Sequence, residues 1–151
     1  MKVLIALIAL IPSLTFADDI FRNSDMNAST GWKGDKSYDE IEENKVLRLK
    51  ASPNKVMSFF QDANTRNMPD VVLKFRYMTA DYKGRGLQLR GQRLNGAGTF
   101  KNMDLIADGQ WHEQTWLFSE VRGNPKITFF FNLKEGEGTV YFDDVSLEAK
   151  E

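Results

Sequence analysis

The sequence predicts an all-β protein built as a sandwich of two packed sheets. Short runs in which apolar and polar residues alternate recur along the chain, whereas no segment after residue 17 keeps the 3.6-residue period of a helix. Gly, Asn, Asp and Pro gather between these runs, as they do in turns. Roughly seven or more short strands separated by such turns are typical of a β-sandwich.

The first predicted strands lie in the N-terminal half of the chain. Residues 46–51 alternate strictly, and residues 55–61 repeat the pattern before a loop over 62–70 that is rich in Asn and Asp. Residues 71–78 then place Leu, Phe and Tyr on one side and Lys and Arg on the other. Each run therefore has one face suited to a core and one suited to solvent.

The next strands follow a glycine-containing turn at residues 82–86. Residues 87–90 alternate again, and the glycines of 91–98 indicate a long irregular connection. Two more strands are predicted over 111–118 and 127–133, with a Gly-Asn-Pro turn between them.

The last predicted strand, residues 136–148, changes phase in its middle. Its apolar side chains alternate on one face as far as Phe142 and on the opposite face from Val145 onward. Asp143 and Asp144 stand at the change, and a β-bulge is the simplest backbone device that moves side chains from one face to the other. Two adjacent acids at a bulge indicate either a bound cation or an edge position.

The first 17 residues predict a secretory signal peptide. Lys2 supplies a positive start, residues 3–11 carry no charge, and Thr15 and Ala17 are small residues that suit a signal-peptidase site. The apolar run is too short for a stable transmembrane helix. We therefore expect a signal peptide over 1–17, a single domain over 18–151, no membrane insertion after cleavage, and a secreted or periplasmic location; an uncleaved anchor is the alternative.

Composition limits the classes of partner. The chain has no cysteine, so a secreted domain of this sequence must be held by its core, with or without a metal. Twenty basic and 21 acidic residues give a net charge of −1, and no block of like charge occurs. This balance argues against nucleic acid and against an anionic membrane surface, and it favours a neutral or mildly charged partner.

Three short motifs resemble those of carbohydrate-binding modules of families 4, 9 and 22. Residues 23–27 followed by Gly31-Trp32 are similar to the opening motif of these modules, and residues 108–111 are similar to their tryptophan strand. Residues 143–147 resemble the end of their last strand. The resemblance implies a galactose-binding-like jelly-roll sandwich and a non-catalytic module that holds a poly- or oligosaccharide on one sheet face.

The resemblance also implies a structural calcium ion that joins the N-terminal segment to the last strand. Carried over by position, its ligands would be Asp25, Asn27, and Asp143 or Asp144. Calcium takes six to eight oxygen ligands, and Asn27 stands where the family often has Glu, which removes one charge. The alternative is that the acids cap a bulge and face solvent.

Most aromatic residues are predicted to lie in the core. Phe75, Tyr77, Phe129 and Phe131 share a side with aliphatic residues, and Trp32 after a glycine turn is typical of a core plug. Trp111 and Trp116 would lie on opposite faces of one strand, one buried and one more exposed. Tyr38 and Tyr82 have polar neighbours and are therefore the candidates for exposed stacking on sugars.

Polar residues suggest a candidate binding stripe. Lys74 and Arg76, with Gln88, Arg90 and Gln92 on the strand expected beside them, would point away from the core. In the modules that the chain resembles, one concave sheet face is the binding groove, and a basic groove would favour acidic or sulfated glycans. The alternative is an ordinary solvated sheet face.

Catalysis finds little support in the sequence. The chain has one histidine, no cysteine nucleophile and no Gly-x-Ser-x-Gly elbow, and no motif singles out a carboxylate pair of the glycosidase type. Two hypotheses therefore remain. The chain is either an exported carbohydrate-binding module or a cell-envelope module that uses the same sandwich for protein–protein interaction or a structural role.

Overall fold

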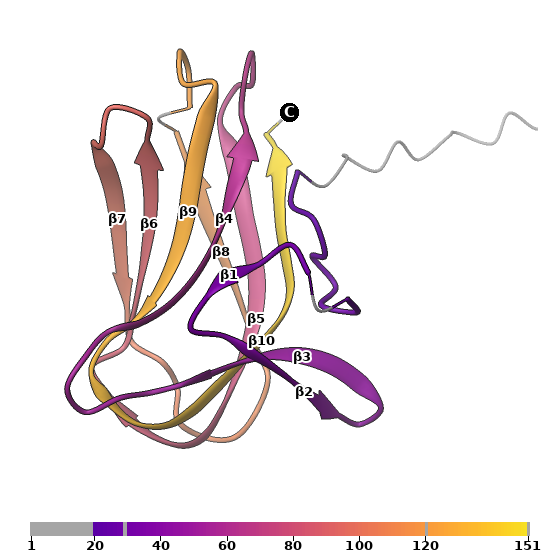
Figure 1. Ribbon diagram of the computed structural model, residues 1–151, viewed down its shortest axis with the longest axis vertical. Coiled ribbons are helices and arrows are strands. Elements are labelled where there is room, and N and C mark those ends of the chain that lie inside the picture. Colours follow the sequence, from indigo (N-terminus) through magenta and orange to yellow (C-terminus); the bar gives the residue numbers. More distant parts are fainter. Residues whose placement is uncertain (1–19, 29, 120, 151) are drawn as a thin grey trace, which may run out of the picture.

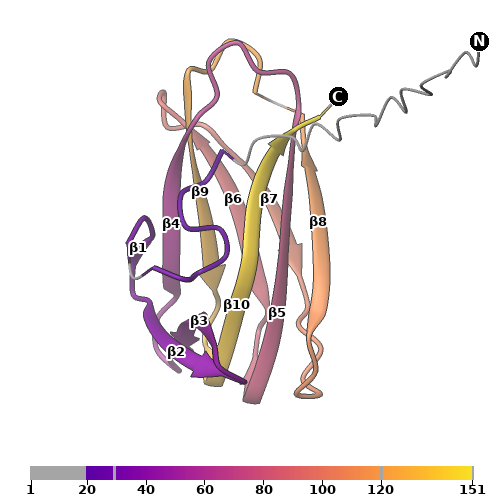
Figure 2. The same ribbon diagram turned by 90° about the vertical axis from the view of Figure 1, so that its right-hand side faces the viewer.

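The computed structural model describes residues 20–28, 30–119 and 121–150, so the predicted signal peptide lies outside the described residues. Ten β-strands form in the described part of the chain, and no helix does. Figures 1 and 2 show these strands as two sheets packed face to face. The predicted all-β sandwich is therefore confirmed. The described residues contain no helix that is long and apolar enough to cross a membrane.

Each sheet has five strands, and all neighbouring strands are antiparallel. Sheet I consists, in spatial order, of β1 (Lys33–Gly34), β4 (Met57–Asn64), β9 (Lys126–Leu133), β6 (Leu87–Arg93) and β7 (Gly98–Met103). Sheet II consists of β2 (Ser37–Ile41), β3 (Asn44–Lys50), β10 (Gly136–Ala149), β5 (Val71–Gly84) and β8 (His112–Phe118).

An aromatic cluster fills the space between the sheets. Phe59 and Phe131 stack with ring centroids 4.4 Å apart, and Trp32 and Phe142 meet Phe59 edge-on at 5.3 and 4.9 Å. Edge-on and stacked pairs of this kind add stability beyond the area that they bury. The predicted core positions are confirmed for Trp32, Phe75, Tyr77, Phe129 and Phe131, and Trp116 is buried while Trp111 is half-buried.

Three strands were not expected from the sequence. The two-residue β1, the polar β2 and the edge strand β7 contain no fully buried side chain, so their sequences lack the apolar alternation on which prediction relies. Residues 91–98 were expected to form one long irregular connection. Instead, β6 continues to Arg93, and a short turn of residues 94–97 leads into β7. Strands β4 and β5 also extend further than predicted, to Asn64 and Gly84.

The predicted bulge in β10 is confirmed. The register of β10 against β5 shifts between Asp143 and Ser146, and Asp144 has a φ of 48°. A second shift occurs beside Gly138, whose φ is 87°. A positive φ suits glycine and is reached by Asp more readily than by most residues.

The N-terminal segment completes one edge of β10. Strand β3 pairs with β10 only over residues 139–142. Beyond the bulge, the Val145 amide donates to the Ser24 carbonyl at 2.9 Å, and the Ile20 amide donates to the Leu147 carbonyl at 2.8 Å. The start of the described chain therefore lies beside its last strand.

Glycine at position 138 is required twice, by backbone conformation and by space. A Cβ atom there would lie 2.3 Å from the Asp81 carbonyl oxygen, whereas a Cβ at Gly96, which also has a positive φ, would meet nothing within 4 Å. We expect Gly138→Ala to lower the free energy of unfolding by about 3 kcal/mol or more, and Gly96→Ala by only about 1–2 kcal/mol, the cost of the left-handed conformation. Urea unfolding measures both. Equal losses in the two variants would show that the contact with Asp81 has no cost.

Candidate functional site

The outer face of sheet I carries a row of three aromatic side chains and one arginine that runs across four strands. Phe60 of β4 is paired with Phe130 of β9, Phe130 with Arg90 of β6, and Arg90 with Phe100 of β7. The flanking residues in β4, β9 and β6 are buried, so these side chains point away from the core. We call Phe60, Phe130, Arg90 and Phe100 the aromatic row.

The members of the aromatic row contact one another. The rings of Phe60 and Phe130 have centroids 4.9 Å apart, and the Arg90 guanidinium lies 5.1 Å from the Phe100 ring and 5.9 Å from the Phe130 ring. Phe100 is 52% exposed. Nε of Arg90 is buried and has no hydrogen-bond partner among the described residues. The row is thus a partly exposed apolar surface with one cation held among its rings.

A row of polar side chains lies beside the aromatic row, two residues away along the same four strands. The Ser58 hydroxyl donates to the Asn132 side-chain oxygen at 2.8 Å, the Asn132 amide donates to Gln88 at 3.4 Å, and the Gln88 amide donates to Asn102 at 3.2 Å. This chain of contacts crosses the sheet from β4 to β7. It fixes the orientation of three amide groups, each of which has both donor and acceptor atoms.

A charged group lies on the other side of the aromatic row, toward β1. The Asp62 carboxylate accepts from the Thr128 hydroxyl at 2.6 Å and lies 3.1 Å from the Lys126 ammonium and 3.8 Å from that of Lys33. Burial alone would raise the pKa of Asp62, but the hydroxyl and the two ammonium groups outweigh it and hold the pKa below its ordinary value. This carboxylate is therefore already neutralised by neighbours.

Together these rows have the chemistry of a sugar-binding surface. Aromatic faces cover the C–H patches of a pyranose ring, and fixed amide and guanidinium groups bond its hydroxyl or carboxyl groups. The outer face of sheet I offers both kinds of group side by side.

The expectation of one stripe formed by Lys74, Arg76, Gln88 and Arg90 is wrong. Lys74 and Arg76 lie on β5 in sheet II, whereas Gln88, Arg90 and Gln92 lie on β6 in sheet I. The turn at residues 85–86 carries the chain from one sheet to the other. The two groups therefore occupy opposite outer faces of the sandwich, and Gln88, Arg90 and Gln92 join the face that carries the aromatic row.

The tyrosines expected to be exposed are not. Tyr82 is 7% exposed, and its hydroxyl accepts a hydrogen bond from the Gly86 amide at 2.9 Å, so it is part of the core and of the β5–β6 turn. Tyr38 on β2 is half-buried and packs against the core of the sandwich. The polar neighbours that suggested exposure belong to the opposite face of each strand.

Lys74 and Arg76 are engaged within sheet II. The Lys74 ammonium lies 3.0 Å from the Glu148 carboxylate. Arg76 pairs with Asp143 and Asp144, and its guanidinium lies 4.5 Å from the Trp111 ring. These two side chains and their neighbours line a hollow of about 240 Å³ on the outer face of sheet II.

The four residues proposed as calcium ligands are arranged differently from an oxygen shell. The Asp143 carboxylate is 1% exposed and accepts from Arg76, from the Asn44 side-chain amide at 2.8 Å and from the Asp144 backbone amide at 2.9 Å. The Asp25 carboxylate accepts from the Asn27 side-chain amide at 2.7 Å. Among the described residues, no group of three His, Cys, Asp or Glu side chains is placed to hold a metal. As they lie, these residues do not fit the ion, and calcium binding stays a prediction.

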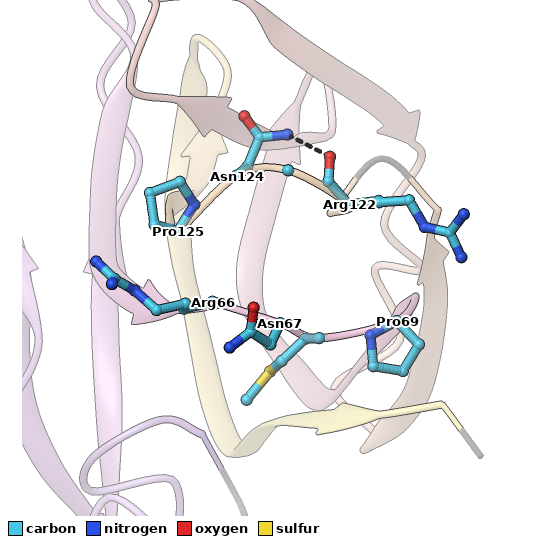
Figure 3. Close-up of a pocket in the computed structure, with 8 residues that line it drawn as sticks. Arg66, Asn67, Pro69, Arg122, Asn124 and Pro125 are labelled. Carbon is cyan, nitrogen blue, oxygen red and sulfur yellow. Dashed lines mark hydrogen bonds between the residues drawn. The ribbon is translucent and has the colours of Figure 1, made fainter.

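A larger hollow, of about 800 Å³, lies between the β4–β5 and β8–β9 loops at one end of the sandwich. The buried Thr65 ties the loops together, because its hydroxyl donates to the Asn124 carbonyl at 2.6 Å and its amide donates to the Pro125 carbonyl at 3.1 Å. Figure 3 shows Arg66 and Arg122 on opposite sides of this hollow, pointing away from each other. The two cations thus do not converge on one point.

Sequence reasoning missed Phe60, Phe100 and Phe130. A signal was available for two of them, because three consecutive phenylalanines at 129–131 cannot all face the core of an alternating strand, and neither can the pair at 59–60. Phe100 lies on β7, which was not predicted as a strand. Its place in the row therefore had no signal in the sequence.

Comparison with known proteins supports the fold. No protein-family model matches the chain, and no curated protein does either. A solved family 61 carbohydrate-binding module in complex with β-1,4-galactotriose is similar to it, with a TM-score of 0.68 at 12% identity over 89% of this chain and 100% of that chain. The xylan-binding CBM22-1 domain of Paenibacillus barcinonensis Xyn10C matches with a TM-score of 0.62 at 10% identity, over 88% and 95% of the two chains.

The chain shares its β-sandwich fold with these carbohydrate-binding modules. The resemblance noted in the sequence motifs is thus confirmed at the level of fold, and a family 16 module adds to it with a TM-score of 0.61 at 14% identity over 86% of this chain and 99% of that chain. Some similar structures come from enzymes. An exo-β-agarase matches with a TM-score of 0.61 at 12% identity over 88% of this chain, which covers 25% of the agarase chain.

The Asp62 cluster predicts a specific pH dependence of stability. Because the pKa of Asp62 is lower in the folded state than in the unfolded state, its contribution is complete above about pH 4 and is lost as pH falls through the folded-state pKa. We therefore expect the midpoint of urea unfolding to fall less between about pH 5 and pH 2 in Asp62→Asn than in the parent chain. Glu40→Gln, which removes an exposed carboxylate on β2, is the control for loss of one charge. If the unfolding midpoint falls by the same amount at acid pH in all three proteins, this role of Asp62 is contradicted.

Proposed function

We propose that the chain is a non-catalytic, exported carbohydrate-binding module that holds a poly- or oligosaccharide on the outer face of sheet I. The observation that carries the proposal is the aromatic row with its flanking row of amides. Phe60, Phe130 and Phe100 offer ring faces for stacking on pyranose C–H groups. Gln88 and Asn132, oriented by their mutual hydrogen bond, offer donors and acceptors for hydroxyl groups.

The similar solved structures support a sugar as ligand. One of these modules was solved in complex with β-1,4-galactotriose, and another is a xylan-binding domain. Such ligands belong to those proteins, and they make neutral β-linked glycans the natural first probes for this one. Export agrees with the signal peptide predicted over residues 1–17.

Arg90 adds a preference for acidic glycans. Its guanidinium lies near the Phe100 and Phe130 rings, and its buried Nε has no hydrogen-bond partner among the described residues. A uronate carboxylate or a sulfate would receive charge-assisted hydrogen bonds from it. The Asp62 carboxylate on the same face is neutralised by Lys126 and Lys33 and does not oppose such a ligand.

A binding role without catalysis agrees with the composition of this face. Glycoside hydrolysis requires two carboxyl groups on either side of the scissile bond. In the described rows around Arg90, Asp62 contributes the one carboxylate, and it is held by Thr128 and Lys126. This arrangement supports the proposal of a module that holds a glycan without cleaving it.

The alternative function is a cell-envelope module that binds a protein or serves a structural role. The observation in its favour is an exposed apolar edge, because Leu94 in the β6–β7 turn is 67% exposed and Phe100 on β7 is 52% exposed. Exposed apolar residues that lie together can mark a protein-binding surface.

Substitutions on the two outer faces test the location of the site. We expect Phe130→Ala and Arg90→Ala each to weaken glycan binding about ten-fold or more, equivalent to about 1.4 kcal/mol. Lys74→Ala, on the opposite face, is the matched control and should bind like the parent chain. Calorimetry against β-1,4-galactan, xylan and polygalacturonate provides the measurement, with Tm recorded to show that each variant is folded. A loss confined to Lys74→Ala would place the site on sheet II instead.

Charge at Arg90 gives a second, separate test. Polygalacturonate should bind more tightly than the neutral glycans, and its affinity should fall as salt concentration rises, because exposed charges are screened. In Arg90→Gln this preference and the salt dependence should both largely disappear. Equal binding of acidic and neutral glycans by the parent chain would contradict the acidic preference. If none of the three polysaccharides binds, the protein-interaction alternative is favoured.

A further inference from the structure

The bulge in β10 buries a carboxylate that requires a positive partner. Asp143 is 1% exposed, and its carboxylate lies between Arg76 of β5 and Asn44 at the start of β3. Moving an ionised carboxylate out of water is costly unless it is paired and hydrogen-bonded. Asp143 is both, since it receives bonds from Arg76, from Asn44 and from the backbone amide of Asp144.

One guanidinium serves both acids of the bulge. Arg76 lies directly opposite Asp143 in the β5–β10 register, so its Nη2 reaches the buried Asp143 carboxylate. Its Nε lies 3.1 Å from the Asp144 carboxylate in an ion pair without hydrogen-bond geometry, and the Asp144 side chain is 64% exposed. The Trp111 ring covers the guanidinium at 4.5 Å and restricts its movement. Arg76 is thus fixed from three sides in a bridge between adjacent carboxylates.

This bridge is where the resemblance places a calcium ion. The same position joins the bulge to the N-terminal segment, because the Val145 amide, immediately after the acids, donates to the Ser24 carbonyl. A calcium ion there would need the carboxylate oxygens that already accept hydrogen bonds from Arg76 and Asn44. The guanidinium and the metal ion are therefore mutually exclusive at Asp143.

We propose that Arg76 replaces the structural calcium ion of this fold, so that the junction between the bulge and the N-terminal segment is held by an internal cation. The domain then has no need of a divalent ion at this junction. Without Arg76, the carboxylates of Asp143 and Asp144 would face each other uncompensated. That variant would bind a divalent cation in place of the guanidinium.

Thermal unfolding in calcium and in EDTA tests the proposal. For the parent chain, we expect the same Tm in both. Arg76→Ala should melt about 10 °C lower or more in EDTA, because removing one partner leaves a buried charge unpaired, and millimolar calcium should restore part of the loss. Lys74→Ala is the matched control, since Lys74 lies two residues away on the same strand and makes an exposed ion pair with Glu148. Its Tm should stay close to that of the parent chain in both conditions.

Two results would overturn the proposal. The first is a parent Tm that EDTA lowers and calcium raises, which is the outcome that a calcium site at Asp25, Asn27, Asp143 and Asp144 predicts. The second is an Arg76→Ala protein that melts like the parent chain in EDTA. If Arg76→Ala does not fold, calorimetric titration of calcium into the EDTA-treated parent chain still decides: no binding supports the proposal, and binding that Asp144→Ala abolishes refutes it.

Discussion

The stack of Phe59 on Phe131 is the contact around which the sandwich is organised. It joins β4 to β9 in the middle of sheet I, and Phe142 of sheet II packs against both rings. A chain without cysteine has no disulfide to hold its sheets together, so the packing of the core around this contact must supply the stability. The stack also fixes the outer face. Because side chains alternate, setting Phe59 and Phe131 inward sets Phe60 and Phe130 outward.

The two outer faces differ in the kind of side chain that they present. Sheet I displays rings and amides that contact one another, beside the ion pairs of Asp62 with Lys126 and Lys33. Sheet II displays ion pairs, among them Arg48 with Asp39 and Lys74 with Glu148. Charged side chains that are already paired gain little from a neutral ligand, whereas aromatic faces lose contact with water when a sugar covers them. This contrast is why the proposed site lies on sheet I.

Local features of the structure could be predicted from the sequence, and pairings between distant segments could not. The bulge at Asp143 and Asp144 follows from a change of phase within one strand, so the sequence alone reveals it. The assignment of β5 and β6 to one sheet failed because the period-two pattern is the same whether a chain turns back within a sheet or crosses to the other. Arg76 was expected to face a ligand for the same reason. The alternation of residues in β5 places the Arg76 side chain on the outer face. It does not reveal the partner of this side chain, because Asp143 is 67 residues away in the chain.

The central position of β10 has a consequence for the order in which the protein can fold. This strand comes last in the chain, yet it lies between β3 and β5 in sheet II and also holds the N-terminal segment along its edge. A chain that emerges progressively during synthesis therefore cannot assemble sheet II until its final 14-residue strand is available. Sheet II therefore forms through contacts between segments that are far apart in the sequence, such as Ser24 and Val145, and contacts of this kind slow the start of folding.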